Sequence, residues 1–213
     1  MESILANILT DRPISDLNQK YLKFIRRSYS PKVIYDIGAS TTCWSRYAQL
    51  IFPDAEIYMF DADDHFVKYY QGRKYFIACL GNDDDKDVIF YDSCKYDDEK
   101  TRSCYMSDRL EPNYKVLKSV KLDTLVKNNN IPLPDLVKIN CCGSEKDVID
   151  GGVETIKNAK YMIVNLQNDK TFIDAPTAYE VGPYIQSLGF DLEDSLDSFG
   201  LKLIDYVFKN KNI

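Results

Sequence analysis

The stretch Val33-Ile-Tyr-Asp-Ile-Gly-Ala-Ser-Thr-Thr-Cys-Trp44 predicts a buried strand, a tight turn at Gly38 and the start of a helix. Some twenty residues on, Glu56-Ile-Tyr-Met-Phe60 predicts a second strand that runs into the acidic segment 61–64. This is the arrangement with which α/β sheets hold an adenosine-containing cofactor. The turn offers backbone N–H groups, and the carboxylate at the end of the second strand accepts hydrogen bonds from ribose hydroxyls.

Strand-like and helix-like patterns alternate along the rest of the chain. Strands are predicted at 33–37, 56–60, 74–80, 87–91, 116–120, 135–140, 161–166, 190–192 and 203–208, and helices at 42–52, 63–71, 122–127, 144–157 and 176–188. This alternation predicts an α/β fold, a Rossmann-like doubly wound sheet that is mainly parallel. No helix separates the last two strands, so they predict an antiparallel edge.

The length of 213 residues suits a single domain spanning 1–213, with an N-terminal helical extension at 1–30 and a core at 31–209. Residues 92–114 are polar and irregular, and their tyrosines suggest a lid over a bound ligand. The alternative is that these tyrosines pack on the domain. A homo-oligomer is compatible with the sequence.

Composition excludes several classes of function. The net charge of −6, with scattered lysines and arginines, argues against nucleic acid as a partner. No apolar run is long enough to cross a bilayer, and the N-terminus does not resemble a signal peptide. The six cysteines form no Cys-x-x-Cys pair, and the lone His65 cannot complete a zinc site. We therefore expect a cytoplasmic protein with reduced cysteines, no membrane partner and no metal-site residues.

The turn itself distinguishes between cofactors. A dinucleotide needs a glycine-rich turn so that the backbone can approach the pyrophosphate. Residues 38–43 contain one glycine only, so a pyrophosphate would be crowded. S-adenosylmethionine has no phosphate, and Asp36, Gly38 and Asp61 could supply the turn and the acids that it needs. Two plainer interpretations stay open, in which Gly38 is an ordinary turn and Asp61 belongs to a solvated helix N-terminus.

The segment Asp135-Leu-Val-Lys-Ile-Asn-Cys-Cys-Gly-Ser-Glu145 resembles the FkbM-type S-adenosylmethionine-dependent methyltransferases. Other segments resemble motifs of that family in the same order, and the resemblance covers residues 31–209. They are Tyr35–Ala39, Tyr58–Ala62, Leu122–Leu125, Gly151-Gly152, Ala175-Pro176, Leu188–Phe190 and Asp205–Phe208.

The resemblance implies a class I methyltransferase fold with a seven-stranded sheet. It also implies S-adenosylmethionine as cofactor and a hydroxyl of a sugar, glycan or related small molecule as methyl acceptor. The residues that it assigns to the cofactor are Asp36, Gly38, Ala39, Ser40, Asp61, Ala62, Gly81, Asn82 and Asp83. The family commonly has Asn at the position of Ser40, Gly at Thr42 and Asp at Asn140, so this chain departs from the pattern there.

Lys138, Asn140 and Glu145 are the predicted catalytic residues. Lys138 in a buried strand needs a partner, and Glu145 at the following helix start could be that partner, either structurally or in catalysis. Asn140 cannot act as a base but could position the acceptor or cofactor. Asp169 and Asp174 are further candidate bases, His65 is expected at the surface, and use of a divalent metal is left open.

Two functions follow from these features. The first is an O-methyltransferase acting on a sugar or glycan hydroxyl. The second is a methyltransferase-like domain that has lost catalysis and serves as a binding or assembly module, which the missing ionisable groups favour. Relatives often carry Glu and His where this chain has Asn165 and Asn168.

Overall fold

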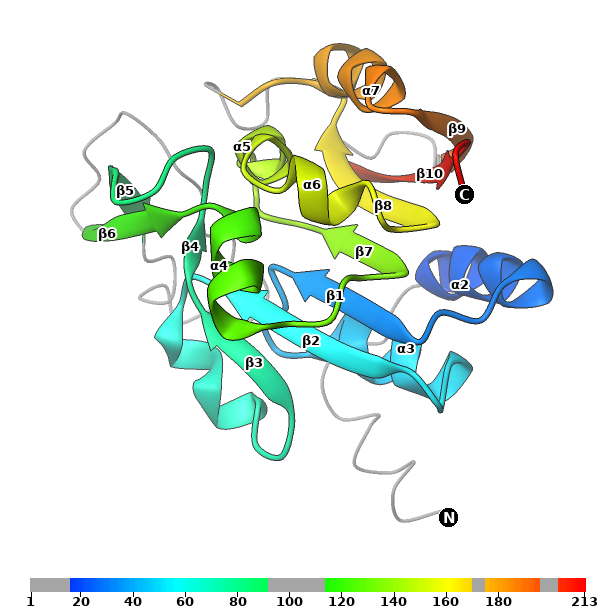
Figure 1. Cartoon of the computed structure of the whole chain (residues 1–213), viewed down its shortest axis with the longest axis horizontal. Helices are drawn as coiled ribbons and strands as arrows, with labels where there is room; N and C mark the ends of the chain where they lie inside the picture. Colours follow the sequence, from blue (N-terminus) through cyan, green and yellow to red (C-terminus); the bar gives the residue numbers. More distant parts are fainter. Residues whose placement is uncertain (1–15, 92–113, 170–174, 196–202) are drawn as a thin grey trace.

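The computed structural model describes residues 16–91, 114–169, 175–195 and 203–213. Its centre is a seven-stranded sheet of order β3-β2-β1-β7-β8-β10-β9 (Figure 1). The strands of this sheet are β1 Val33–Ile37, β2 Glu56–Asp61, β3 Lys74–Ile77, β7 Leu136–Ile139, β8 Tyr161–Gln167, β9 Phe190–Ser195 and β10 Leu203–Asn210.

The sheet is parallel except at one edge, as predicted. Strand β1 pairs in parallel with β2 and β7, and β8 continues the parallel series. Strand β10 is antiparallel to both β8 and β9. The Rossmann-like fold class and the antiparallel edge are therefore confirmed.

Helices cover both faces of the sheet (Figure 1). They are α2 Asp16–Ser28, α3 Cys43–Ile51, the 3₁₀ helix η1 Asp64–Tyr69, α4 Leu122–Asn129, α5 Glu145–Asp150, α6 Val153–Ile156 and α7 Ala178–Ser187. One buried cluster joins α2, α3 and η1 to the sheet, and the other joins α4, α5, α6 and α7 to its opposite face. Side chains alternate along each strand, so each central strand contributes to both clusters.

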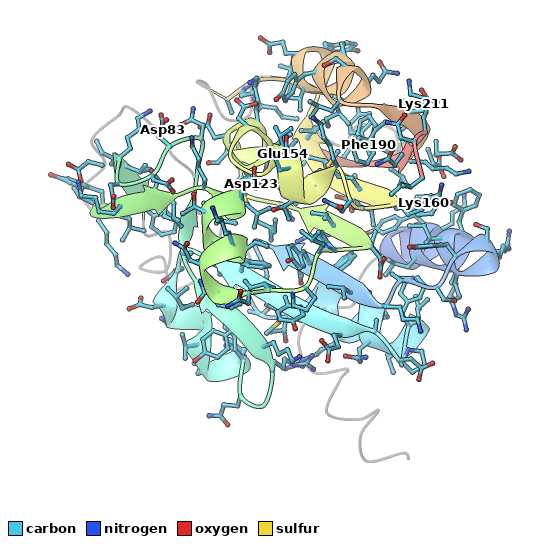
Figure 2. The ribbon with its side chains drawn as sticks, in the orientation of Figure 1. Asp83, Asp123, Glu154, Lys160, Phe190 and Lys211 are labelled. Atoms are coloured by element: carbon cyan, nitrogen blue, oxygen red, sulfur yellow. The ribbon has the colours of Figure 1, made fainter. Side chains whose placement is uncertain are left out.

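The break that two adjacent glycines predicted in the helix at 144–157 is present. Helix α5 ends before Gly151, and α6 begins at Val153. A Cβ on Gly151 would lie 2.0 Å from the carbonyl oxygen of Gly81, so only glycine fits there. In Figure 2, Asp123 of α4 lies beside Glu154, and its carboxylate accepts the first N–H groups of α6 from Glu154 and Thr155.

The prediction of one continuous strand over 74–80 was wrong. The structure divides it into β3 and a short strand β4, Cys79–Leu80, which belongs to a second sheet of order β4-β6-β5. Strands β5, Asp87–Tyr91, and β6, Tyr114–Val120, form an antiparallel pair in this sheet. The division falls at Ala78, whose N–H donates to the carbonyl of Asp61 at the end of β2. Beyond this point the chain leaves the first sheet.

Some sequence expectations lie outside the described residues. The segment 92–113, which holds most of the predicted lid, is one, and Asp174 is another. Across the ranges that the structure describes, no helix is both long and apolar enough to span a membrane.

Candidate cofactor and acceptor site

The turn after β1 is built against the end of β7. Gly38 has φ +77°, and a Cβ added to it would lie 1.9 Å from the carbonyl oxygen of Asn140. Its N–H donates to the carbonyl of Phe60, at 2.8 Å. Glycine is therefore required for two reasons, because the backbone is left-handed and because neighbouring backbone fills the space of a side chain.

Two further residues of this turn have positive φ without being glycine. Ser40 has φ +46° and Thr42 has φ +64°. These are the positions where the resembling family commonly has Asn and Gly, residue types that adopt this backbone readily. The turn thus keeps its left-handed conformation despite the departures, and Thr42 holds it with a β-branched side chain.

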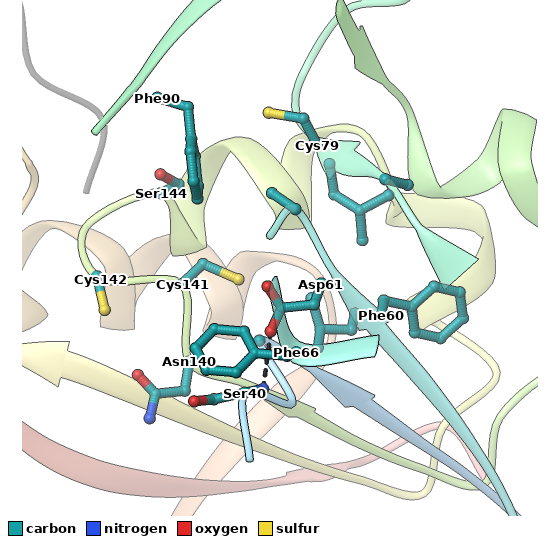
Figure 3. A pocket seen from close by; sticks show the side chains of 15 residues that line it. Ser40, Phe60, Asp61, Phe66, Cys79, Phe90, Asn140, Cys141, Cys142 and Ser144 are labelled. Carbon is teal, nitrogen blue, oxygen red and sulfur yellow. Dashed lines mark hydrogen bonds between the residues drawn. The ribbon is translucent and has the colours of Figure 1, made fainter. Parts of the chain in front are cut away.

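Asp61 links the turn to the end of β2. Its carboxylate accepts a hydrogen bond from the backbone N–H of Ser40, at 2.7 Å (Figure 3). It accepts a second from the backbone N–H of Asp63, at 2.9 Å. Burial raises the pKa of Asp61 above its ordinary value, although both N–H donors act in the opposite direction. Each carboxylate oxygen accepts one backbone bond and keeps a lone pair for a ligand hydroxyl.

These residues line a pocket at the carboxyl ends of β1, β2 and β7 (Figure 3). One part is polar, with Gly38, Ser40, Asp61 and Asn140. The other part is apolar, and its walls include Phe66, Ala78, Leu80 and Phe90. A carboxylate beside an apolar slot matches the two halves of a nucleoside, whose ribose needs hydrogen-bond acceptors and whose base needs apolar walls.

Of the predicted cofactor residues, Gly38, Ser40, Asp61 and Ala62 line this pocket. Ala39 is buried instead in the core under α2 and α3.

Gly81 and Asn82 line a neighbouring pocket, which shares Ser144 with the first. Asp83 is exposed near the β5–β6 hairpin and lines neither pocket (Figure 2). The chain segment that contributes to the apolar part of the first pocket is thus 78–80, directly before the predicted 81–83.

Lys138 has a different partner from the one predicted. Its ammonium lies 3.1 Å from Oδ1 of Asp36, and it donates to the carbonyl oxygen of Gly38 at 3.3 Å. Both side chains are buried, and Ser45 of α3 donates to the other oxygen of Asp36. Burial alone would lower the pKa of Lys138, but the Asp36 carboxylate raises it above its ordinary value. Asp36 and Lys138 thus lie beneath the turn on the α2–α3 face of the sheet, and neither lines the two pockets described above.

Glu145 forms no ion pair with Lys138 in the described part of the chain. Its two carboxylate oxygens accept the backbone N–H groups of Cys141, at 2.8 Å, and Gly143, at 2.9 Å. These bonds fix a loop in which Cys142 has φ +52° and Gly143 has φ +108°. Burial raises the pKa of Glu145 to about 7. Glu145 therefore shapes the end of β7, where Asn140 and Cys141 form part of the pocket wall.

A row of polar side chains on the α2–α3 face was not predicted as a site. Asp205 of β10 accepts hydrogen bonds from Asn165 Nδ2, at 2.8 Å, and from the Tyr21 hydroxyl, at 3.3 Å. The same hydroxyl accepts a bond of 2.8 Å from Nε1 of Trp44. In the sequence, these polar residues interrupt two otherwise apolar strands. Only the register between β8 and β10 shows that they lie side by side.

Two other expectations concern metals and His65. Within the described ranges, no group of three or more His, Cys, Asp or Glu side chains is placed to hold a metal ion. His65 is exposed, and its ring lies 3.3 Å from the ammonium of Lys68.

The strand order and the site together define the class I methyltransferase fold, and comparisons with known proteins agree. The sequence profile of the methyltransferase FkbM domain matches residues 36–192. The chain therefore belongs to the FkbM methyltransferase family and is an S-adenosylmethionine-dependent methyltransferase. Comparison with curated protein sequences gives no significant match.

Solved structures are similar in fold at low sequence identity. Precorrin-6y C5,15-methyltransferase from Geobacter metallireducens has a TM-score of 0.53 at 11% identity, covering 94% of this chain and 90% of its own. Magnesium protoporphyrin IX methyltransferase from Synechocystis, with bound S-adenosylmethionine, has a TM-score of 0.52 at 8% identity and coverages of 96% and 88%. A methyltransferase from Aquifex aeolicus that depends on S-adenosylmethionine has a TM-score of 0.50 at 14% identity, with coverages of 95% and 96%.

The residues of the pocket fit S-adenosylmethionine. Asp61 would hold the ribose hydroxyls, the apolar walls would hold the adenine, and the turn at Gly38 and Ser40 would pass the methionine portion. The cofactor supplies an electrophilic methyl group on a sulfonium. Among the described residues that line this pocket, Asp61 is the one acidic side chain.

Proposed function

We propose that this chain is an O-methyltransferase that methylates a hydroxyl of a sugar, a glycan or a related small molecule. The observation that carries the proposal is the end of β7, where Asn140 lines the pocket beside Gly38 and Ser40. The neutral amide of Asn140 can donate to or accept from a hydroxyl group. The segment 140–143 lacks the Asp/Asn-Pro-Pro-aromatic tetrapeptide with which many N-methyltransferases hold a nucleobase.

The composition is consistent with an uncharged, polyhydroxylated acceptor. The net charge of −6 disfavours nucleic acid, whose phosphates need a basic surface. A neutral small molecule requires only hydrogen-bonding groups at the sheet edge, which Asn140 and Asn165 could supply.

The direct test is methyl transfer from S-adenosylmethionine that carries a deuterated methyl group. The protein is incubated with a panel of methyl glycosides, sugar nucleotides and oligosaccharides, and products are analysed by mass spectrometry. We expect one panel member to gain one deuterated methyl group on oxygen, located by fragmentation. Transfer to nitrogen or carbon instead would contradict the proposal.

Cofactor binding can be tested separately with S-adenosylhomocysteine in calorimetry. Asp61→Asn keeps the size of the side chain but removes its charge and half of its acceptor capacity. We expect affinity to fall about 10- to 100-fold, as for the loss of hydrogen bonds to a charged group. Asp64→Asn is the matched control, because the Asp64 side chain is 74% exposed. This variant should bind S-adenosylhomocysteine with wild-type affinity.

A second candidate function is a binding module that holds the cofactor without catalysis. The observation that favours it is that the described lining of the first pocket contains no histidine or lysine to remove a proton. It predicts normal binding of S-adenosylhomocysteine together with no mass change in any acceptor. A methylated product that depends on Asp61 would exclude it.

A further inference from the structure

Methylation of a hydroxyl requires a group that takes up its proton, and the described residues that line the first pocket include no carboxylate beyond Asp61. Asp61 already binds two backbone N–H groups and lies where the ribose would be held. Asn140 cannot accept a proton at neutral pH. The base must therefore be sought outside the pocket lining, at the same edge of the sheet.

Strand register places Asp205 at that edge. Lys138 pairs with Ile163, and Ile163 pairs with Val207. Two residues nearer the carboxyl ends of β7 and β8, which is two residues earlier in the antiparallel β10, the next row contains Asn140, Asn165 and Asp205. The pair Asn165–Asp205 is part of the observed register, and Asn140 continues the ladder because its N–H donates to the carbonyl of Ile37.

The three side chains of this row share one face, because alternate residues of a strand point to the same side. Neighbouring strands are about 4.8 Å apart, so the backbones of Asn140 and Asp205 are separated by about 10 Å. This span, with Asn165 between, is the width of a small polar acceptor lying across the strand ends.

The carboxylate of Asp205 is held in position but remains accessible. Asn165 donates to one oxygen at 2.8 Å and Tyr21 donates to the other at 3.3 Å, which leaves a lone pair on each. Asp205 is half-buried, so part of the residue is exposed to solvent. Tyr21 is itself fixed by the indole N–H of Trp44.

The charges around Asp205 are not balanced. In the row beneath, Lys138 is already paired with Asp36 at 3.1 Å. Among the described residues, no ammonium or guanidinium lies within ion-pair distance of Asp205. Asp36 and Asp205 thus share the charge of Lys138, and the donors that contact Asp205 directly are neutral. A partly buried carboxylate in this position is a candidate for a functional role.

We propose that Asp205 is the general base that accepts the proton of the acceptor hydroxyl. This rests on the proposed O-methyltransferase function. As the hydroxyl oxygen forms its bond to the methyl carbon, the O–H proton passes to the Asp205 carboxylate. The bond between the methyl carbon and sulfur breaks, and its electron pair stays on sulfur, which gives the neutral thioether S-adenosylhomocysteine. The proton is then released to solvent.

The experiment uses Asp205→Asn in the full chain, with the panel acceptor that the wild type methylates. We expect kcat to fall at least about 100-fold, while affinity for S-adenosylhomocysteine and the melting temperature stay at wild-type values. Asp205→Glu, which keeps the carboxylate, should recover part of the rate.

Asp191→Asn is the matched control, since Asp191 on the neighbouring strand β9 forms an exposed ion pair with Lys211. The kcat of this variant should be that of the wild type. A wild-type kcat in Asp205→Asn would overturn the assignment of Asp205 as the base. The proposed O-methyltransferase function would not be affected by that result. Loss of S-adenosylhomocysteine binding or of stability in Asp205→Asn would overturn it too, in favour of a structural role. Absence of any methylated product from the wild type would overturn both proposals.

Discussion

Gly38 and Gly72 differ in what surrounds them, although both have positive φ. A Cβ on Gly38 would collide with the backbone of Asn140, whereas a Cβ on Gly72 would meet nothing within 4 Å. We expect Gly38→Ala to lower the free energy of unfolding by more than about 3 kcal/mol and to abolish S-adenosylhomocysteine binding. Gly72→Ala, with backbone strain only, should lose about 1 kcal/mol and bind normally. Urea unfolding and calorimetry measure both, and equal effects of the two variants would contradict the role of the Asn140 contact.

Thr42 is strained in the same turn. It is fully buried with φ +64°, and its hydroxyl has no hydrogen-bond partner. We expect Thr42→Gly to raise the free energy of unfolding by about 1 kcal/mol, because relief of strain and of the unsatisfied hydroxyl outweighs the lost methyl group and the added chain entropy. Thr41→Gly is the control. Thr41 does not have positive φ, so this variant should lose stability. A decrease for Thr42→Gly would show that its packing matters more than its strain.

Glu145 gives stability a defined pH dependence. Its pKa is raised from 4.5 to about 7 by burial, so the folded chain binds its proton more tightly than the unfolded chain. This contribution is fully present below about pH 4.5 and is lost as the pH rises through 7, by at most about 3 kcal/mol. Glu145→Gln mimics the protonated form, so we expect the decline in stability between pH 5 and 7.5 to be smaller than in the wild type. Parallel curves for the two proteins, from denaturant unfolding at each pH, would contradict this.

At the level of single residues, the sequence predicts which side chains matter more reliably than it predicts the residues that they contact. Asp61 was predicted from its place at the end of a strand, and it lines the pocket. Lys138 was recognised as a buried cation in need of a partner, but the nearby Glu145 was favoured. The actual partner, Asp36, is set by the parallel register of β1 and β7, in which these two residues stand opposite each other. Such a register depends on tertiary pairing and is not contained in local patterns.

At the level of elements, the alternation of strands and helices was predicted well because each has its own periodicity. The division of 74–80 into two strands was not predicted, since the apolar run continues through both halves and the division depends on their different pairing partners. The row that contains Asn165 and Asp205 was missed as a site for the same reason. It arises where β10 returns antiparallel to β8.

Besides its apolar packing, helix α2 is hydrogen-bonded to α3 and to the sheet through the hydroxyl of Tyr21. Tyr21 accepts from Trp44 of α3 and donates to Asp205 of β10, and it is buried. Tyr21→Phe leaves the buried indole N–H without a partner, so we expect a loss of about 1–3 kcal/mol in the free energy of unfolding. Tyr179→Phe is the control, because Tyr179 is 80% exposed, and it should unfold like the wild type. If both variants unfold alike, the hydroxyl of Tyr21 does not hold α2 to the sheet.

For the whole molecule, the sequence predicts one cooperative domain over 1–213, and the lone Trp44 permits a test. Trp44 lies in α3, so its fluorescence reports on one face of the sheet, while far-UV circular dichroism reports on all helices and strands. In a two-state domain both signals change at the same urea concentration. S-adenosylhomocysteine at 100 times its dissociation constant should then raise the free energy of unfolding by about 2.7 kcal/mol from either signal. An Asp61→Asn variant should show a smaller increase at the same ligand concentration. A dichroism transition separate from that of Trp44, and unmoved by the ligand, would instead reveal a second unit that folds independently of the cofactor site.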